Sequence, residues 1–294
     1  MRNIAACYSD HAIKVSDSYC SGPSNRPYVL PNPPPSIREA VSSIYKAKLS
    51  VSMKQVLIKI IWCSLSGLGF TVSLCEGNPS SSSSSSPSSY SSRQLRKVKG
   101  SKKFESCNSE IEIIWDLSWA KYGPGPEPVS GYYIAIFIDS ELGLLLGDMK
   151  EEIELTMEYA KFSIISRVER FSGNGGVYST KARFSESGLR HEIMIRLFGE
   201  GLEVSVDKKR VMKVERLQWN FRGNETMFVD GMVVDMMWDV HDWLFKSSEL
   251  CCSGSAVFMF RTRSGVDSRL WLDEKIMDHR FGFSLLICAC KNPD

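Results

Sequence analysis

Apolar and polar residues alternate in short segments along most of the chain. The segments "VYSTKARF" (177–184), "HEIMIRLF" (191–198) and "LEVSVD" (202–207) each place their apolar side chains on one face of an extended strand and their polar side chains on the other. One buried face and one wet face are typical of an antiparallel sheet. The chain is therefore predicted to be built mainly from antiparallel strands.

Other segments extend this pattern toward both ends of the chain. "GYYIAIFID" (131–139) is apolar at nearly every position, which indicates a strand deep inside a sheet, and 141–148 follows so closely that the two should form a hairpin. Asp230-Gly231 lies between two apolar runs, which is the strongest short hairpin signal. Further strands are predicted at 42–51, 54–63, 67–76, 109–118, 254–263 and 281–290. The segment 161–171 fits either a helix or a strand, and we favour a strand.

The predicted fold class is all-β, with about a dozen strands and one short helix. The helix is expected at 149–160, where acidic residues crowd the first turn. Strands and helices do not alternate, so a parallel α/β fold is not expected. An antiparallel β-barrel or a two-sheet β-sandwich remains, as a single domain over 41–294 that follows an extended tail over 1–40.

A serine-rich and basic segment interrupts this domain. Seven consecutive serines cannot bury enough apolar area to offset the entropy of ordering, so 78–106 is predicted to be a disordered linker. Its second half is basic, which suits a nuclear-import signal, a phosphate-seeking patch or simply a solvated loop. The adjoining serines are candidate phosphorylation sites. The basic residues are Arg93, Arg96, Lys97, Lys99, Lys102 and Lys103.

Composition narrows the class of protein. The 294 residues carry a formal net charge of only +2, so binding to nucleic acid is not expected. The N-terminus lacks the apolar core of a signal peptide, and the apolar stretch 56–65 is too short to span a bilayer. We expect a protein without a membrane span in the cytoplasm or nucleus, where its nine scattered cysteines stay reduced as small buried hydrophobes.

The stretch "WDLSWAKYGPGPEPVSGYYIAIFID" (115–139) joins two predicted strands through three prolines and three glycines. Prolines and glycines of this kind make a rigid corner, and the stretch lacks the pattern of a phosphate-binding loop. One interpretation is a connection that places Trp115 and Trp119 against the sheet. The other is a binding rim built on Glu127 and the aromatic residues.

Two further stretches carry candidate chemistry. In "MWDVHDWLF" (237–245), Asp239 and His241 are suitable metal ligands, but no third ligand is evident, and Asp239 more simply ends the strand. In "ERLQWNFRGNETMFVDG" (215–231), cations alternate with aromatic residues. This pattern suits either single-stranded nucleic acid or a strand whose arginines stack on its own tryptophans, and we favour the second interpretation. The residues of this alternation are Arg216, Trp219, Phe221 and Arg222.

Several long motifs together resemble a known family. They are the opening "AIKVSD", 115–137, 142–148, "WNFRGNETMFVDGMVVDMMWDVHDWLF", "GSAVFMFRTR" and the closing "GFSLLICACKN". They are similar to the plant family catalogued as domain of unknown function 868, and the resemblance runs from about Val41 to Asn292. It implies an intracellular plant protein and supplies no activity, ligand or catalytic residue.

Two functions compete at this point. The first is a non-catalytic module that binds an unidentified protein partner through an aromatic-rich rim, and the second is a lipocalin-like barrel that holds a small apolar ligand. An enzyme of unknown reaction is third, since no catalytic constellation, cofactor site or metal site is predicted. The candidate rim residues are Trp115, Trp119, Glu127, Trp219, Arg222, Asp239 and His241.

Overall fold

The structure, a computed structural model, describes residues 36–67, 69–76, 91–106, 108–149, 161–185, 188–245, 254–263 and 281–291. They belong to a compact unit that spans Pro34–Asp294. The first strand begins at Ile37, so the domain starts a few residues before the boundary expected at 41. The remainder of the expected tail lies outside the described residues.

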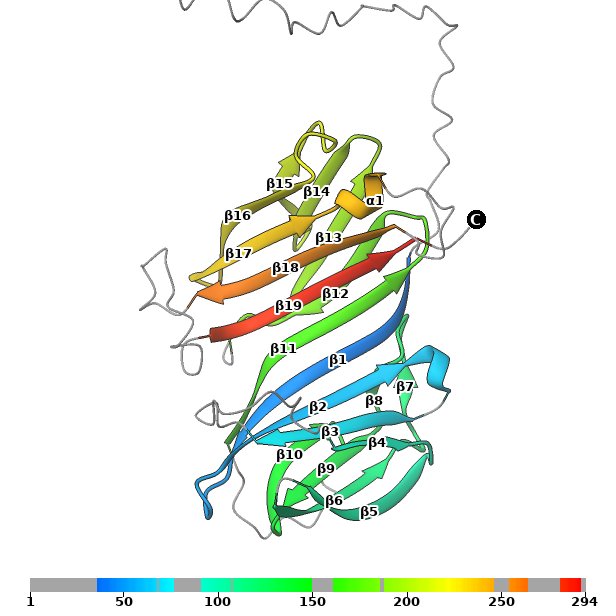
Figure 1. The fold of residues 1–294 in the computed structure, drawn as a ribbon, viewed down its shortest axis with the longest axis vertical. Coiled ribbons are helices and arrows are strands. Elements are labelled where there is room, and N and C mark those ends of the chain that lie inside the picture. The colour runs from blue at the N-terminus through cyan, green and yellow to red at the C-terminus, as the bar shows by residue number, and fades with distance from the viewer. Residues whose placement is uncertain are drawn as a thin grey trace, which may run out of the picture. The chain divides into compact units, whose positions relative to one another are not determined.

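A nine-stranded sheet runs through this unit (Figure 1). Neighbouring strands in it are antiparallel except for one pair, β11 and β19. In spatial order the strands are β16 (Arg222–Val229), β17 (Met232–Asp239), β18 (Ser255–Arg263), β19 (Phe281–Cys290), β11 (Lys161–Ser172), β1 (Ile37–Lys48), β2 (Gln55–Cys63), β3 (Phe70–Glu76) and β4 (Ser91–Leu95).

Smaller elements complete the fold. One four-stranded sheet has the order β10 (Glu141–Gly147), β9 (Tyr133–Ile138), β6 (Ser109–Asp116) and β5 (Lys99–Ser106). The other has the order β12 (Val177–Ala182), β13 (His191–Phe198), β14 (Gly201–Val206) and β15 (Lys209–Val214). The remaining elements are a hairpin of β7 (Lys121–Tyr122) and β8 (Pro128–Ser130), the short helix α1 (His241–Phe245) and a 3-10 turn, η2 (Ser64–Ser66).

The parallel pair follows from the way the second half of the chain folds. Among the described residues, β11 to β19 are nine successive strands, and the six pairs of successive strands that hydrogen-bond to each other are all antiparallel. The first and ninth strands of such a meander run in the same direction. When the meander doubles back and brings its two ends together, these strands can only pair in parallel.

Two apolar cores lie on the same face of the nine-stranded sheet. Along β11, the residues Arg167, Glu169 and Phe171 share one face because side chains alternate along a strand. Glu169 lies opposite Ile287 on one side and Val41 on the other. Ile287 belongs to the core under β12–β15, whereas Val41 belongs to the core under β5, β6, β9 and β10. The fold is therefore two β-sandwiches that share one large sheet.

Both cores are filled by large side chains. Trp62, Phe70 and Trp115 meet in the first core, with ring centroids 5.1 and 6.0 Å from Phe70. Tyr178 forms the centre of the second, where its ring contacts Phe171, Phe258 and Trp243. Contacts of this kind add to the stabilisation from burial alone.

Turns and close packing use glycine where the backbone or a neighbour requires it. Asp230 and Gly231 both have positive φ (51° and 73°), which confirms the tight hairpin predicted between β16 and β17. Gly223 lies opposite Trp238, and a Cβ there would be 2.3 Å from the indole ring. Only glycine leaves room for that ring.

The all-β prediction is confirmed, and the described strands form open, sandwich-like sheets rather than one closed barrel. The boundary of the expected linker is corrected, because Ser91–Leu95 forms β4 and Lys99–Ser106 forms β5. Its serine-rich part, 78–90, lies outside the described residues, as does the helix expected at 149–160 apart from Met149. The described helix, α1, begins where "MWDVHDWLF" leaves β17.

Candidate functional site

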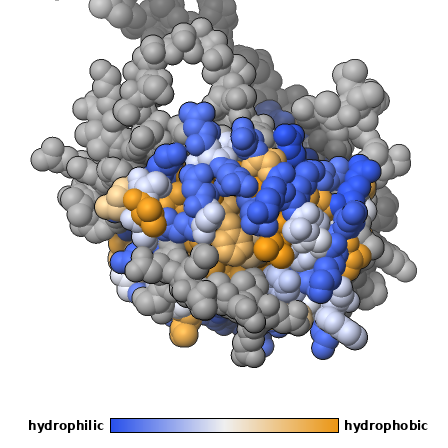
Figure 2. All heavy atoms as spheres, turned by 90° about the horizontal axis from the view of Figure 1, so that it is seen from below, coloured by the Kyte–Doolittle hydropathy of each residue, from blue (hydrophilic) through white to orange (hydrophobic). Residues whose placement is uncertain are grey.

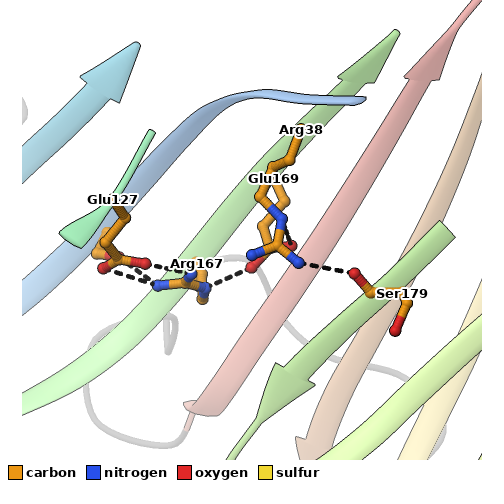
Figure 3. Close-up of polar contacts among 6 residues, drawn as sticks. Arg38, Glu127, Arg167, Glu169 and Ser179 are labelled. Carbon is orange, nitrogen blue, oxygen red and sulfur yellow. Dashed lines mark hydrogen bonds and ion pairs between the residues drawn. The ribbon is translucent and has the colours of Figure 1, made fainter. Parts of the chain in front are cut away.

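Four charged side chains form a continuous chain between the two cores (Figure 3). Arg167 donates from Nε to Glu169 at 2.7 Å and from its two terminal nitrogens to Glu127 at 3.2 and 2.5 Å. Arg38 Nε lies 3.1 Å from the second oxygen of Glu169, and another Arg38 nitrogen donates to the carbonyl oxygen of Ser179 at 2.7 Å. These ion pairs and hydrogen bonds thus link β1, β11, β12 and the loop before β8.

Glu169 is the most buried member of this chain, with a fully inaccessible side chain. A buried carboxylate is stable only when it is paired and hydrogen-bonded. Arg38 and Arg167 supply that pairing from both sides, and the guanidinium of Arg38 also stacks over Phe171 at 5.2 Å. The four groups together carry no net charge, which lets them occupy the space between two apolar cores.

This chain of ion pairs shifts the pKa values of neighbouring side chains. Burial alone would lower the pKa of Arg167, but Glu127 and Glu169 raise that pKa above its ordinary value. Burial, reinforced by Glu127, raises the pKa of Tyr45 to about 12, and the pKa of Tyr132 is raised for the same two reasons. None of these groups exchanges protons near neutral pH, so the arrangement suits holding elements together rather than proton transfer.

The four charged side chains anchor an exposed hairpin, which we call the aromatic hairpin and define as Trp119–Ser130. Glu127 fixes its second arm to Arg167, and Pro128 is buried. Gly125 packs on Arg38, where a Cβ would lie 3.1 Å from the Arg38 Cδ. The stretch that raised the question of a rigid corner or a binding rim therefore forms a rigid corner that presents exposed side chains.

The aromatic hairpin exposes three large hydrophobic side chains. Trp119 is 75% exposed, Val129 66% and Tyr122 44%. Trp115, by contrast, is buried in the core, where its Nε1 donates to the carbonyl oxygen of Lys97 at 2.8 Å. Of the first three predicted rim residues, Trp119 is exposed, Glu127 anchors the aromatic hairpin to Arg167, and Trp115 is part of the buried core.

The other four predicted rim residues lie in the second sandwich. Arg222 donates to Asp239 at 2.7 Å and stacks over Phe221 at 5.6 Å, so its aromatic partner is a phenylalanine where a tryptophan was expected. Asp239 also accepts from the backbone N–H of His241 at 3.0 Å, so it ends β17 and caps α1. Trp219, in the preceding turn, is 82% exposed.

Sequence reasoning missed a second polar contact, at His191. Its Nδ1 lies 2.6 Å from Asp207 and its Nε2 lies 2.8 Å from Asp230. Both aspartates occupy tight turns with positive φ, one between β14 and β15 and one between β16 and β17. The imidazole therefore joins a turn of a four-stranded sheet to a turn of the nine-stranded sheet. The sequence did contain a sign of this contact, because His191 begins a strand whose other inward positions are apolar, and a polar side chain among them needs a partner.

Two of the six basic residues expected in the linker form cross-strand ion pairs. Lys99 lies 2.6 Å from Asp116, and Lys103 lies 3.0 Å from Glu112. Figure 2 shows this end of the molecule as mostly hydrophilic, with apolar side chains between the charged ones. Such pairing offsets the charge that a phosphate-seeking patch would use.

Other candidate chemistry is sparse in the described part of the chain. Cys63, Cys75, Cys288 and Cys290 are half-buried, and burial raises the pKa of Cys288. Cys251 and Cys252 lie outside the described residues. Among the described residues, no group of three or more histidine, cysteine or acidic side chains is placed to hold a metal ion.

A hollow of about 500 Å³ opens at the turns beside β5, β6 and β9, and its lining is polar. It differs in character from the apolar cavity that a carrier of small apolar ligands needs. The residues that line the hollow are Glu105, Ser106, Asn108, Ser109, Glu110 and Asp139.

Within the described residues, no helix combines the length and apolar character needed to cross a bilayer.

The fold and the buried ion-pair chain define an all-β protein of two sandwiches that share a sheet. The chain belongs to the DUF868 family, described as plant protein of unknown function, whose family model matches residues 36–291. This confirms the resemblance inferred from the sequence motifs. No curated protein and no solved structure matches the chain.

Proposed function

We propose that this protein is a non-catalytic protein-interaction module and that the aromatic hairpin, Trp119–Ser130, is its partner-binding element. The observation that carries the proposal is the exposure of Trp119 on a hairpin whose base is tied down by the Glu127–Arg167 ion pair. Tryptophan is among the residues that contribute most to protein interfaces, where a ring enters an apolar pocket of the partner.

The anchoring of the hairpin supports the same conclusion. Binding through a flexible loop costs free energy, because the loop must be ordered in the complex. Here the prolines at 124, 126 and 128 restrict the backbone, and Asp148 accepts hydrogen bonds from the backbone N–H groups of Gly131 and Tyr132 at 2.7 and 3.2 Å. The side chains of Trp119, Tyr122 and Val129 are therefore presented with little further ordering to do.

The alternative function, a carrier of a small apolar ligand, is less well supported. Fully buried aromatic rings occupy the middle of both sandwiches, where such a ligand would sit. Native mass spectrometry of protein purified from plant tissue separates the two functions. A small molecule that copurifies in stoichiometric amount would favour the carrier.

The proposal is tested by affinity purification from plant tissue with the full chain as bait. The wild type, Trp119→Ala and Trp219→Ala are compared, because Trp219 is equally exposed but lies on the other sandwich. Proteins retained by the wild type and by Trp219→Ala but lost from Trp119→Ala are the expected result. For a purified partner, Trp119→Ala should weaken binding by about 30-fold or more. Equal retention by all three baits would contradict the proposal.

A further inference from the structure

Strand β16 (Arg222–Val229) ends the nine-stranded sheet, and among the described residues no strand pairs with its outer side. Its two-residue turn to β17 makes Val229 and Met232 a pair that exchanges backbone hydrogen bonds. Such pairs recur at every second residue, so the residues between them direct their backbone N–H and C=O groups to the open side. Those residues are Arg222, Asn224, Thr226 and Phe228.

This edge lacks the features that protect other edges of the molecule. At the opposite end of the sheet, β4 has only five residues and carries Arg93. The edge strand β5 carries three lysines and β15 carries two lysines and an arginine, which oppose pairing with another strand. β16 has eight residues with neither lysine nor proline, its Arg222 is neutralised by Asp239, and Phe228 is 77% exposed.

We propose that β16 pairs in antiparallel fashion with β16 of a second copy of this chain, so that two nine-stranded sheets join into one. The two copies would be related by a two-fold axis, because each contributes the same strand. We favour a second copy over an unrelated peptide because the strand can pair with itself over nearly its whole length in a register that brings no like charges together.

Two registers use nearly the whole strand. Centring the pair on Glu225 would place two carboxylates opposite each other, which is destabilising. Centring it on Thr226 places Thr226 opposite its own copy, Asn224 opposite Phe228, and Glu225 opposite Met227. No like charges then meet over seven paired residues, a length of roughly 24 Å.

Self-association through β16 does not depend on the proposed function, because the aromatic hairpin lies on the other sandwich. The two proposals therefore fail separately. Purified protein alone tests the pairing of β16, whereas capture of a partner from tissue tests the hairpin.

The first test measures the mass of the purified full chain by light scattering, from low to high micromolar concentration. The wild type is expected to be a dimer. Thr226→Pro removes one outward N–H from each copy and should weaken the dimer by roughly 30-fold. Thr226→Val is the matched control: both variants lose the 2.8 Å hydrogen bond from Thr226 to Asp235, but the valine variant keeps the N–H and should remain dimeric.

The second test checks the register and does not rely on proline. The pair Asn224→Lys and Phe228→Lys places lysines opposite each other in the dimer, and Asn224→Glu with Phe228→Glu does the same with carboxylates. Each double variant should be monomeric alone, whereas a mixture of the two should form a heterodimer. A monomeric wild type overturns the proposal, as does a dimer that none of these variants affects.

Discussion

Glu127 and Arg167, forty residues apart in the sequence, form an ion pair through both carboxylate oxygens and both terminal guanidinium nitrogens. Glu127 belongs to the aromatic hairpin, and Arg167 belongs to β11, the first strand of the second sandwich. The contact therefore connects the proposed binding element of one sandwich with the framework of the other.

Replacing Glu127 with glutamine tests how much this contact stabilises the fold. Because Arg167 is largely buried and would keep only Glu169 as a charged partner, Glu127→Gln should lower the free energy of unfolding by about 1–2 kcal/mol. Urea unfolding measures the change. Glu215→Gln, which removes an exposed pair with Lys213, is the control and should leave the midpoint unchanged.

Glu169 should be more important for stability than Glu127. Its side chain is fully buried between Arg38 and Arg167, so Glu169→Ala leaves two buried guanidinium groups without their shared carboxylate. We expect a loss of about 3–5 kcal/mol, measured by the same urea titration. A loss below about 1 kcal/mol would mean that water enters the space between the two cores and solvates both arginines.

Two glycines in the aromatic hairpin should respond differently to alanine. At Gly125 the new Cβ would lie 3.1 Å from the Arg38 Cδ, which is tighter than ordinary contact, so Gly125→Ala should destabilise the protein by about 1 kcal/mol. At Gly123 the nearest atom is Val129 Cγ2 at 3.7 Å, so Gly123→Ala should be neutral or slightly stabilising. Thermal unfolding of both variants makes the comparison. Equal effects would contradict the packing of the hairpin on Arg38.

His191 should make stability depend on pH. Burial alone would lower its pKa, but hydrogen bonds to Asp230 and Asp207 raise it above the ordinary value of about 6.5. Its contribution is therefore fully present below the unfolded-state pKa and is lost as the pH rises through the raised folded-state pKa. The same hydrogen bonds lower the pKa values of Asp207 and Asp230. The contribution of these aspartates to stability is therefore lost as the pH falls through their lowered pKa values.

The contact at His191 should thus stabilise the fold most between about pH 4 and pH 6.5. Thermal unfolding of the wild type and of His191→Asn from about pH 5 to pH 9 tests this expectation. The difference between the two proteins should shrink as the pH rises. A difference that stays constant would show that the imidazole acts through packing against Phe184 rather than through its charge.

The sequence predicts the strands well because their alternation is strong. Ile193 and Ile195 face the core as their spacing indicates, and the turn at Asp230-Gly231 is where its residue types place it. Alternation identifies faces but not partners. The pairing of β1 with β11 and the parallel pairing of β11 with β19 join residues far apart in the chain, and no local pattern specifies them.

The candidate site was predicted only in part, for a related reason. In "ISRVERF" the charged residues Arg167 and Glu169 occupy the inward positions, whereas Val168 and Arg170 occupy the outward ones. Period-two reasoning cannot choose a face when both faces carry charge. Glu127 was identified from its loop, but its partner lies on a strand whose orientation only the assembled sheet determines.

The eleven paired positions between β1 and β11 have a practical consequence. If the gene were divided between the codons for Gly147 and Lys161, each fragment would carry one of the two complementary strands. The backbone groups that join β1 to β11 would then be unpaired in both fragments, whereas β1 would keep its pairing with β2 and β11 its pairing with β19. Such halves are expected to reassemble by strand complementation when they are coexpressed. The junction between the sandwiches is therefore a natural place to divide the protein for a complementation assay, in which reporter fragments fused to the two halves would signal their reassembly.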